Sequence, residues 1–181
     1  MNRKTCVPAL VLAAAASGLQ AQTMQPGLWE IQTRTQSASG EMEKAMAQMQ
    51  QQLAAMSPEQ RKMMQDMMGK QGVGVGASGV TAKVCLTREM IERNEVAPQQ
   101  GDCKTTHAPR SGNRMKFTFS CSKPPSNGTG EMTILGPQAF TNTVTVNTTA
   151  SGRSEQVTMH GQGKWLSAEC GAIKPLAAAR P

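Results

Sequence analysis

The chain has 181 residues, with 19 Lys and Arg against 12 Asp and Glu, a formal net charge of +7, and only three Phe, two Trp and no Tyr. This length suits one domain with a modest core, and the scarcity of large aromatic side chains makes covalent crosslinks more valuable. The basic residues are scattered, without a dense run or interleaved stacking aromatics, which argues against nucleic-acid binding.

The N-terminus carries the three parts of a secretory signal peptide in their usual order. Arg3 and Lys4 give a short positive region, residues 7–16 form an apolar run, and Leu19-Gln20-Ala21 resembles a cleavage site. The run is too short to span a bilayer and no later segment is apolar enough to do so, although an ordinary buried helix is the less favoured alternative. We therefore expect residues 1–21 to be removed after Ala21, leaving a soluble mature protein that is periplasmic or secreted.

A strand and a helical insertion open the mature chain. Residues 28–35 alternate apolar and polar side chains, as in a half-buried strand. The insertion covers 38–79, and within it 41–68 repeats apolar residues at steps of three and four, which predicts amphipathic helix. Ser57-Pro58-Glu59-Gln60 resembles a capped helix start, so we expect two helices meeting at Ser57 or one helix kinked there. The glycine-rich residues 69–79 contain a G-x-G-x-x-G match in the wrong context for phosphate binding, and we interpret them as a flexible linker.

The chain beyond the insertion has the pattern of short strands separated by turns. Thr87 should cap a short helix that runs to Asn94, with Met90 on its apolar side. Residues 98–101 and 123–128 are rich in turn-forming residues. The strands that we expect are 81–86, 104–108, 115–121, 131–135, 139–148 and 155–160, the last three as a meander.

One β-hairpin is predicted with its register. The turn signal Arg110-Ser111-Gly112-Asn113 lies between Cys103 and Cys121. Folding the chain about this turn places Cys103 opposite Cys121, and in the same register His107 faces Phe117. Directly opposed residues on antiparallel strands lie within the distance that a disulfide needs.

Four cysteines follow the signal peptide, and they allow three pairings. The hairpin favours Cys103–Cys121, which leaves Cys85 to pair with Cys170 and join the first part of the domain to its end. Zinc is the rival interpretation, but there is no C-x-x-C motif, and the histidines His107 and His160 are isolated. We therefore expect structural disulfides, as suits an exported protein.

The methionine-rich insertion offers three interpretations. Its apolar stripe favours packing, because methionine is a good helix former and a pliable apolar filler. Binding of a partner or lipid is the second interpretation. Soft-metal binding is the third, since thioethers suit Cu(I). The candidate copper ligands are Met42, Met46, Met49, Met63 and Met67.

Catalytic machinery is hard to assemble from this sequence. It has no G-x-S-x-G, no H-E-x-x-H and no cysteine–histidine nucleophile pattern. Acid pairs such as Glu30 with Glu131 look like ordinary surface residues, although a glycosidase-type carboxylate pair depends on their separation in space. We expect no enzymatic activity and no cofactor.

Several short motifs resemble a known family in their order along the chain. They are Pro26-Gly27-Leu28-Trp29-Glu30, Val84-Cys85-Leu86-Thr87, Gly101-Asp102-Cys103-Lys104, Phe119-Ser120-Cys121, Gly163-Lys164-Trp165-Leu166 and Cys170-Gly171. Together they resemble the bacterial domain-of-unknown-function family 3617, over most of residues 25–171. The resemblance implies a small, β-rich, secreted or periplasmic protein without an established activity, and it supplies no catalytic residues.

These observations predict one mainly β domain over residues 22–175, followed by a flexible tail at 176–181. We expect a curved, half-barrel-like antiparallel meander sheet with a helical insertion and two disulfides. Such a domain would bind an apolar small molecule or an envelope protein, with Cu(I) binding through the insertion as the alternative. The residues expected in the core or facing the ligand are Trp29, Ile31, Phe117, Phe119, Phe140, Val144 and Val146.

Overall fold

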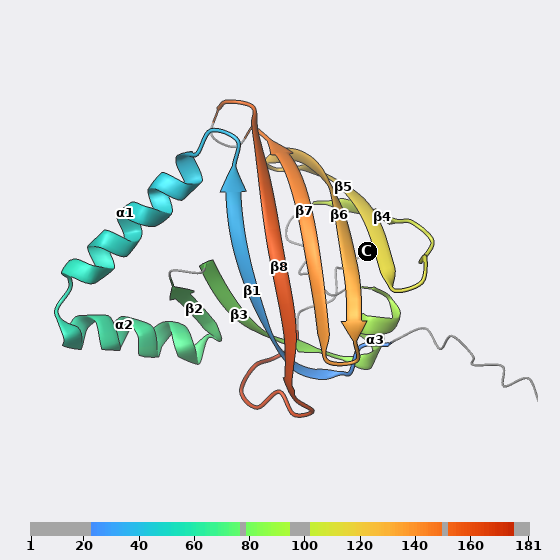
Figure 1. Cartoon of the computed structure of the whole chain (residues 1–181), viewed down its shortest axis with the longest axis horizontal. Helices are drawn as coiled ribbons and strands as arrows, with labels where there is room; N and C mark the ends of the chain where they lie inside the picture. Colours follow the sequence, from blue (N-terminus) through green and yellow to red (C-terminus); the bar gives the residue numbers. More distant parts are fainter. Residues whose placement is uncertain (1–22, 77–78, 95–101, 150–151, 176–181) are drawn as a thin grey trace, which may run out of the picture.

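The structure is a computed structural model that describes residues 23–76, 79–94, 102–149 and 152–175 (Figure 1). In this part of the chain, eight strands form one antiparallel sheet in the order β2-β3-β1-β8-β7-β6-β5-β4, which confirms the predicted β class. The strands are β1 (Gly27–Ser37), β2 (Val73–Gly76), β3 (Gly79–Leu86), β4 (Lys104–His107), β5 (Arg114–Ser122), β6 (Pro125–Gly136), β7 (Ala139–Thr148) and β8 (Glu155–Ser167). The helices are α1 (Glu41–Ala55), α2 (Pro58–Lys70) and α3 (Arg88–Glu92).

Some expectations fall on other parts of the chain. The signal peptide at 1–21, the loop at 98–101 and the tail at 176–181 lie outside the described residues. Among the residues that are described, no helix has the length and apolar character needed to cross a membrane.

The first strand lies inside the sheet. β1 pairs with β3 on one side and with β8 on the other, so segments near the two ends of the chain are neighbours. Trp29, for example, lies opposite Val84 on β3 and opposite Trp165 on β8. From β4 to β8 each strand pairs with the next one along the chain, which confirms the predicted hairpin and meander.

The sheet curls toward one face, which we call the inner face, and the core lies there. Figure 1 shows β3 passing behind β8 to reach α3. The rings of Trp29 and Phe140 lie with centroids 5.3 Å apart although β8 separates their strands. They can meet because β8 presents Gly163 between them, where an added Cβ would overlap the Phe140 ring. The buried core consists of Met24, Trp29, Val84, Leu86, Met90, Met115, Met132, Ile134 and Phe140.

Helix α3 closes one end of this core. The Thr87 hydroxyl accepts a hydrogen bond from the Met90 backbone N–H at 3.3 Å, the cap expected from the sequence. Met90 is the buried residue of the helix and packs into the core. The helix ends at Glu92, two residues before the predicted Asn94.

Both predicted disulfides are present. Cys103 on the approach to β4 bonds Cys121 on β5, with Cα atoms 4.0 Å apart. Cys85 on β3 bonds Cys170, with Cα atoms 5.5 Å apart. The second bond ties the segment after β8 to β3, where Pro175 also forms an isolated parallel bridge with Cys85.

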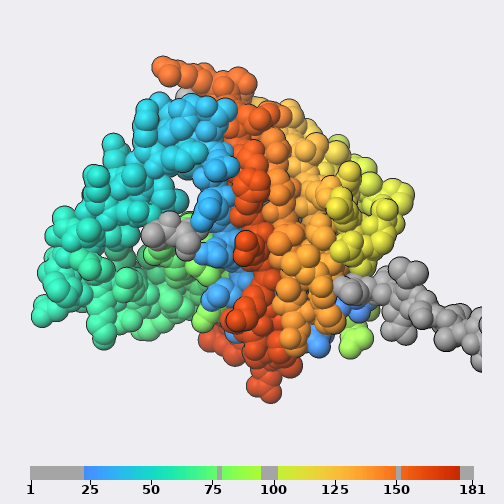
Figure 2. All heavy atoms as spheres, in the orientation of Figure 1, coloured from blue at the N-terminus to red at the C-terminus, as the bar shows by residue number. Residues whose placement is uncertain are grey.

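The insertion forms a helical arm, defined here as α1 and α2. Two helices meet at Ser57, as the sequence allowed, and Ser57 and Gln60 form the predicted capping box. The Arg61 guanidinium fastens this corner by donating to the carbonyls of Leu53 and Met56 at the end of α1, at 3.1 and 3.2 Å. Neither helix has a buried residue. Figures 1 and 2 show the arm standing beside the β1 and β2 side of the sheet, with an opening between it and β1.

Three sequence interpretations were wrong. Residues 73–76 lie in the predicted linker but form β2, which pairs with β3 and places Val75 opposite Val80. The predicted turn at 123–128 ends early because β6 begins at Pro125. β8 continues past the predicted end at His160 to Ser167. In each case glycine or proline lowered the local strand signal, whereas pairing with a neighbouring strand, which is not visible locally, decides the structure.

Candidate functional site

The inner face continues beyond the closed core as an apolar surface. Two rungs of the sheet cross β5, β6, β7 and β8 here, and Phe117 and Phe119 start them on β5. Their apolar side chains are half-buried, unlike those of the core. We call this surface the inner patch: Phe117, Phe119, Val144, Val146, Val157 and Met159.

Two glycines on β6 leave the space that the two aromatic rings of β5 occupy. Gly130 lies opposite Phe117 and Gly128 lies opposite Phe119. An added Cβ at Gly128 would come within 2.6 Å of Phe119 Cζ, and one at Gly130 would overlap the Phe117 ring. The rings therefore lie across the β6 backbone, with centroids 6.5 Å apart, and form a continuous apolar floor. Aromatic rings laid over strand glycines stabilise such positions.

The opposite, outer face is polar and carries an open groove of about 640 Å³ over β4 to β7. A ladder of threonines in register lies on this face, one from each of five neighbouring strands, and its first four members line the groove: Thr106, Thr118, Thr129, Thr145 and Thr158. Alternation explains this division, because threonines at every second position of β7 face away from Val144 and Val146. The groove therefore presents rows of hydroxyl groups.

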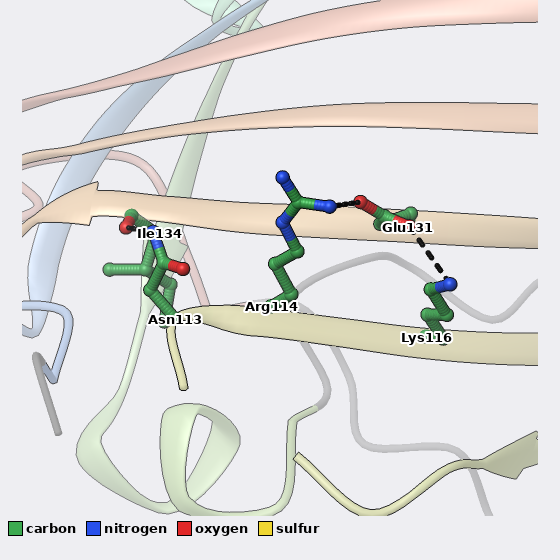
Figure 3. Close-up of polar contacts among 5 residues, drawn as sticks. All are labelled: Asn113, Arg114, Lys116, Glu131 and Ile134. Carbon is green, nitrogen blue, oxygen red and sulfur yellow. Dashed lines mark hydrogen bonds and ion pairs between the residues drawn. The ribbon is translucent and has the colours of Figure 1, made fainter. Parts of the chain in front are cut away.

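One charged cluster includes two residues that line this groove, Lys116 and Glu131. Glu131 on β6 pairs with Arg114 and with Lys116 of β5, each at 3.5 Å. Figure 3 shows the two cations reaching toward Glu131 from either side. The turn before Arg114 is fastened to β6, because the Asn113 side-chain amide donates to the Ile134 carbonyl at 2.9 Å. Two cations thus flank one carboxylate, so the cluster has a net positive charge.

The histidines lie apart in the structure. His107 is exposed at the edge of the inner patch, with its ring centroid 6.1 Å from that of Phe117. His160 lies on the outer face, where its Nδ1 is 3.3 Å from the Thr143 hydroxyl. Among the described residues, no three His, Cys, Asp or Glu side chains are grouped so as to hold a metal ion.

The seven residues predicted for the core or a ligand all come to the inner face, but in two groups. Trp29 and Phe140 are buried in the core, and Ile31 packs against it. The other four belong to the half-buried inner patch. Sequence reasoning missed Val157 and Met159. Apolar and polar residues alternate over 155–160, but this alternation was not used to assign side chains to a face of the sheet. It also missed the Arg114, Lys116 and Glu131 cluster, whose charges alternate with apolar residues on two adjacent strands.

The predicted methionine ligands are divided between the two helices of the arm. Met46 and Met49 on α1 are half-buried, and Met42 is exposed. On α2, Met63 and Met67 are the most exposed, at 69% and 61%. The single stripe expected through Ser57 is interrupted, since Met64 and Met68 are the half-buried methionines of α2.

A family model described as "Protein of unknown function (DUF3617)" matches residues 24–170. The chain belongs to this family. A protein from Pseudomonas putida, named "Uncharacterized protein in lpd-3 5'region", is 39% identical over 142 residues, which cover 76% of this chain and 97% of that protein. No solved structure matches the chain. The DUF3617 match begins at the buried Met24 and ends at the disulfide-bonded Cys170, so it spans the whole sheet.

Proposed function

We propose that this protein is an exported, non-enzymatic binding domain whose inner patch holds the apolar chain of a lipid-like ligand. The observation that carries the proposal is the change along the inner face from a closed core to a half-buried apolar surface. Burial of apolar area drives such binding, and a hydrocarbon chain needs no polar partners.

The composition of the two inner rungs supports an apolar ligand. The first rung carries His107, Phe117, Gly130, Val144 and Met159, and the second carries Thr105, Phe119, Gly128, Val146 and Val157. Neither contains Asp, Glu, Lys or Arg. A charged ligand group placed here would lose hydration without gaining an ionic partner, whereas a methylene chain would gain apolar contact.

The shape of the sheet favours a chain over a protein surface. Because the sheet curls toward its inner face, a flat protein surface would fit this face poorly. A narrow, flexible hydrocarbon chain can follow the rings of Phe117 and Phe119 along the inner patch. The two disulfides support export, since such bonds persist in oxidising compartments.

The test uses the mature protein and a fluorescently labelled long-chain fatty acid as the probe. Val144→Asn places an amide in the inner patch, and Thr143→Asn places the same amide one residue away on the outer face. We expect saturable binding by the unaltered protein, a loss of about tenfold or more with Val144→Asn, and little change with Thr143→Asn, all with unchanged circular dichroism. Absence of binding, or equal effects of the two variants, would overturn the proposal.

Export is tested separately. N-terminal sequencing of protein purified from the periplasm or medium should begin at Gln22. A mature chain that retains residues 1–21 would contradict this part of the proposal.

The second candidate is Cu(I) binding by the arm. Met63 and Met67 lie one helical turn apart on α2 and expose two thioethers on the same side. Titration under reducing conditions should then give a stoichiometric complex that Met63→Leu with Met67→Leu abolishes. No complex, or one unaffected by this double substitution, would remove this candidate.

A further inference from the structure

The outer face has a strong excess of positive charge. Its exposed cations, assigned from strand alternation and register, are Arg34, Lys83, Lys104, Arg114, Lys116 and Lys164. Its acids in the same rows are Glu30 and Glu131. Each acid is flanked by two cations: Glu30 lies opposite Lys83 and Lys164, and Glu131 pairs with Arg114 and Lys116.

Of these charged residues, Lys116 and Glu131 line the groove, and the groove adds hydroxyl groups to this charged face. The threonine ladder crosses the groove from β4 to β7 and continues to Thr158 on β8. Adjacent members lie about 4.8 Å apart because that is the spacing of hydrogen-bonded strands. Threonine hydroxyls both donate and accept hydrogen bonds, as sugar hydroxyls do. From these two features together we propose that the outer groove binds a linear anionic glycan, a chain of sugars bearing carboxylate groups.

The same geometry disfavours other anionic partners. The rings among the groove-lining residues are those of Phe117 and His107, and strand alternation turns both side chains to the inner face. Bases of a single-stranded nucleic acid would therefore find no stacking platform in the groove. A flat anionic bilayer would rest on the rim of the groove and leave the threonines that line it without partners. A linear glycan can lie along the groove and meet Lys116 and the threonine ladder in turn.

Two substitutions in the cluster around Glu131 should change the binding affinity in opposite directions. Lys116→Gln removes a cation and should weaken binding about threefold, the size expected for one exposed charge. Glu131→Gln removes the acid between two cations and should strengthen binding by a similar factor. Lys44→Gln, on the exposed side of α1, makes the same charge change as Lys116→Gln away from the groove and should leave binding unchanged.

The experiment is affinity electrophoresis or calorimetry of the mature protein with polygalacturonate, at low and physiological salt. We expect binding that falls with salt, and none to neutral dextran. Equal effects of Lys116→Gln and Lys44→Gln would overturn the proposal, because net charge alone would then explain binding. Weakening by Glu131→Gln, or binding confined to an oligonucleotide or to anionic vesicles, would also overturn it.

This inference is independent of the inner patch. Val144→Asn should weaken fatty-acid binding about tenfold or more without changing retention by polygalacturonate. Lys116→Gln should weaken that retention about threefold without changing fatty-acid binding. Loss of both activities with either substitution would contradict two separate sites.

Discussion

The ring of Phe117 lies across the backbone of Gly130 on the neighbouring strand, in the space where any other residue would place its Cβ. Phe119 has the same relationship to Gly128. These glycines let the aromatic rings lie flat, and their cost in strand propensity is offset by the apolar surface that the rings cover. The inner patch therefore depends as much on β6 glycines as on β5 aromatics.

Gly130→Ala should destabilise the protein by about 1–3 kcal/mol, because the new methyl group overlaps the Phe117 ring and must displace it. Urea unfolding of the oxidised protein measures this. Gly69→Ala is the matched control: it lies in α2 with nothing within 4 Å of the added methyl, and should stabilise the helix by about 0.5–1 kcal/mol. Equal stability of Gly130→Ala and the unaltered protein would contradict the position of the Phe117 ring over Gly130.

The two disulfides should contribute unequally to stability. In the chain-entropy model, the bond closing 85 residues between Cys85 and Cys170 contributes about 4.6 kcal/mol, and the bond closing 18 residues about 3 kcal/mol. Replacing both cysteines of each pair with alanine and comparing thermal unfolding measures the difference. A larger loss from the Cys103–Cys121 pair would show that native packing outweighs loop closure here.

Phe140→Ala should remove about 3–5 kcal/mol of stability, because the ring is 2% exposed and packs on Trp29 in the core. Leu166→Ala, at a residue that is 38% exposed, should change it by no more than about 0.5 kcal/mol. Denaturant unfolding followed by tryptophan fluorescence measures both. Similar losses in the two variants would contradict the position of the core.

Acid should loosen the start of the arm. The Glu43 carboxylate accepts hydrogen bonds from the Ser37 hydroxyl and backbone N–H at 2.8 and 2.9 Å, and these hold the pKa of Glu43 below its ordinary value of 4.5. A carboxyl whose pKa is lower in the folded state stabilises it above the unfolded pKa, and this contribution is lost as the pH falls through the folded value.

Hydrogen exchange of the α1 amides, measured from about pH 6 to pH 3 and corrected for the intrinsic rate, checks this expectation. Protection at the first turn of α1 should fall with pH in the unaltered protein and in Glu41→Gln, which keeps the Glu43–Ser37 contact. Glu43→Gln should be less protected at the higher pH and lose less on acidification. An identical pH response in all three would contradict it.

Local patterns in the sequence account for much of the fold. The turn at 110–113 predicted the β4–β5 register, and this register predicted both disulfide pairings. The capping box at Ser57 predicted the break between the two helices. Each of these two signals is contained in a few consecutive residues. β2 and the ends of β6 and β8 could not be predicted in this way. Glycine in these segments lowers the strand signal, and the side chain that fills the space beside it comes from another strand. The Phe140 ring on β7, for example, fills the space beside Gly163 on β8.

The candidate sites were only partly accessible to sequence reasoning. Alternation in β7 identified Val144 and Val146 as neighbours on one face, because that pattern is contained in one strand. The cluster of Glu131 with Lys116 depends on register between β5 and β6, which no single strand reveals. The same holds for the threonine ladder, whose members come from five strands.

The pairing of β1 with β8 has a consequence for biogenesis. Leu28 lies opposite Ser167, so the strand synthesised first must wait for the one synthesised last before both of its edges are satisfied. Until then the backbone hydrogen-bonding groups on one edge of β1 are unpaired and can pair with other unfolded chains. A chaperone that covers this edge would prevent such pairing. Completion of the sheet is therefore expected only after β8 has been synthesised.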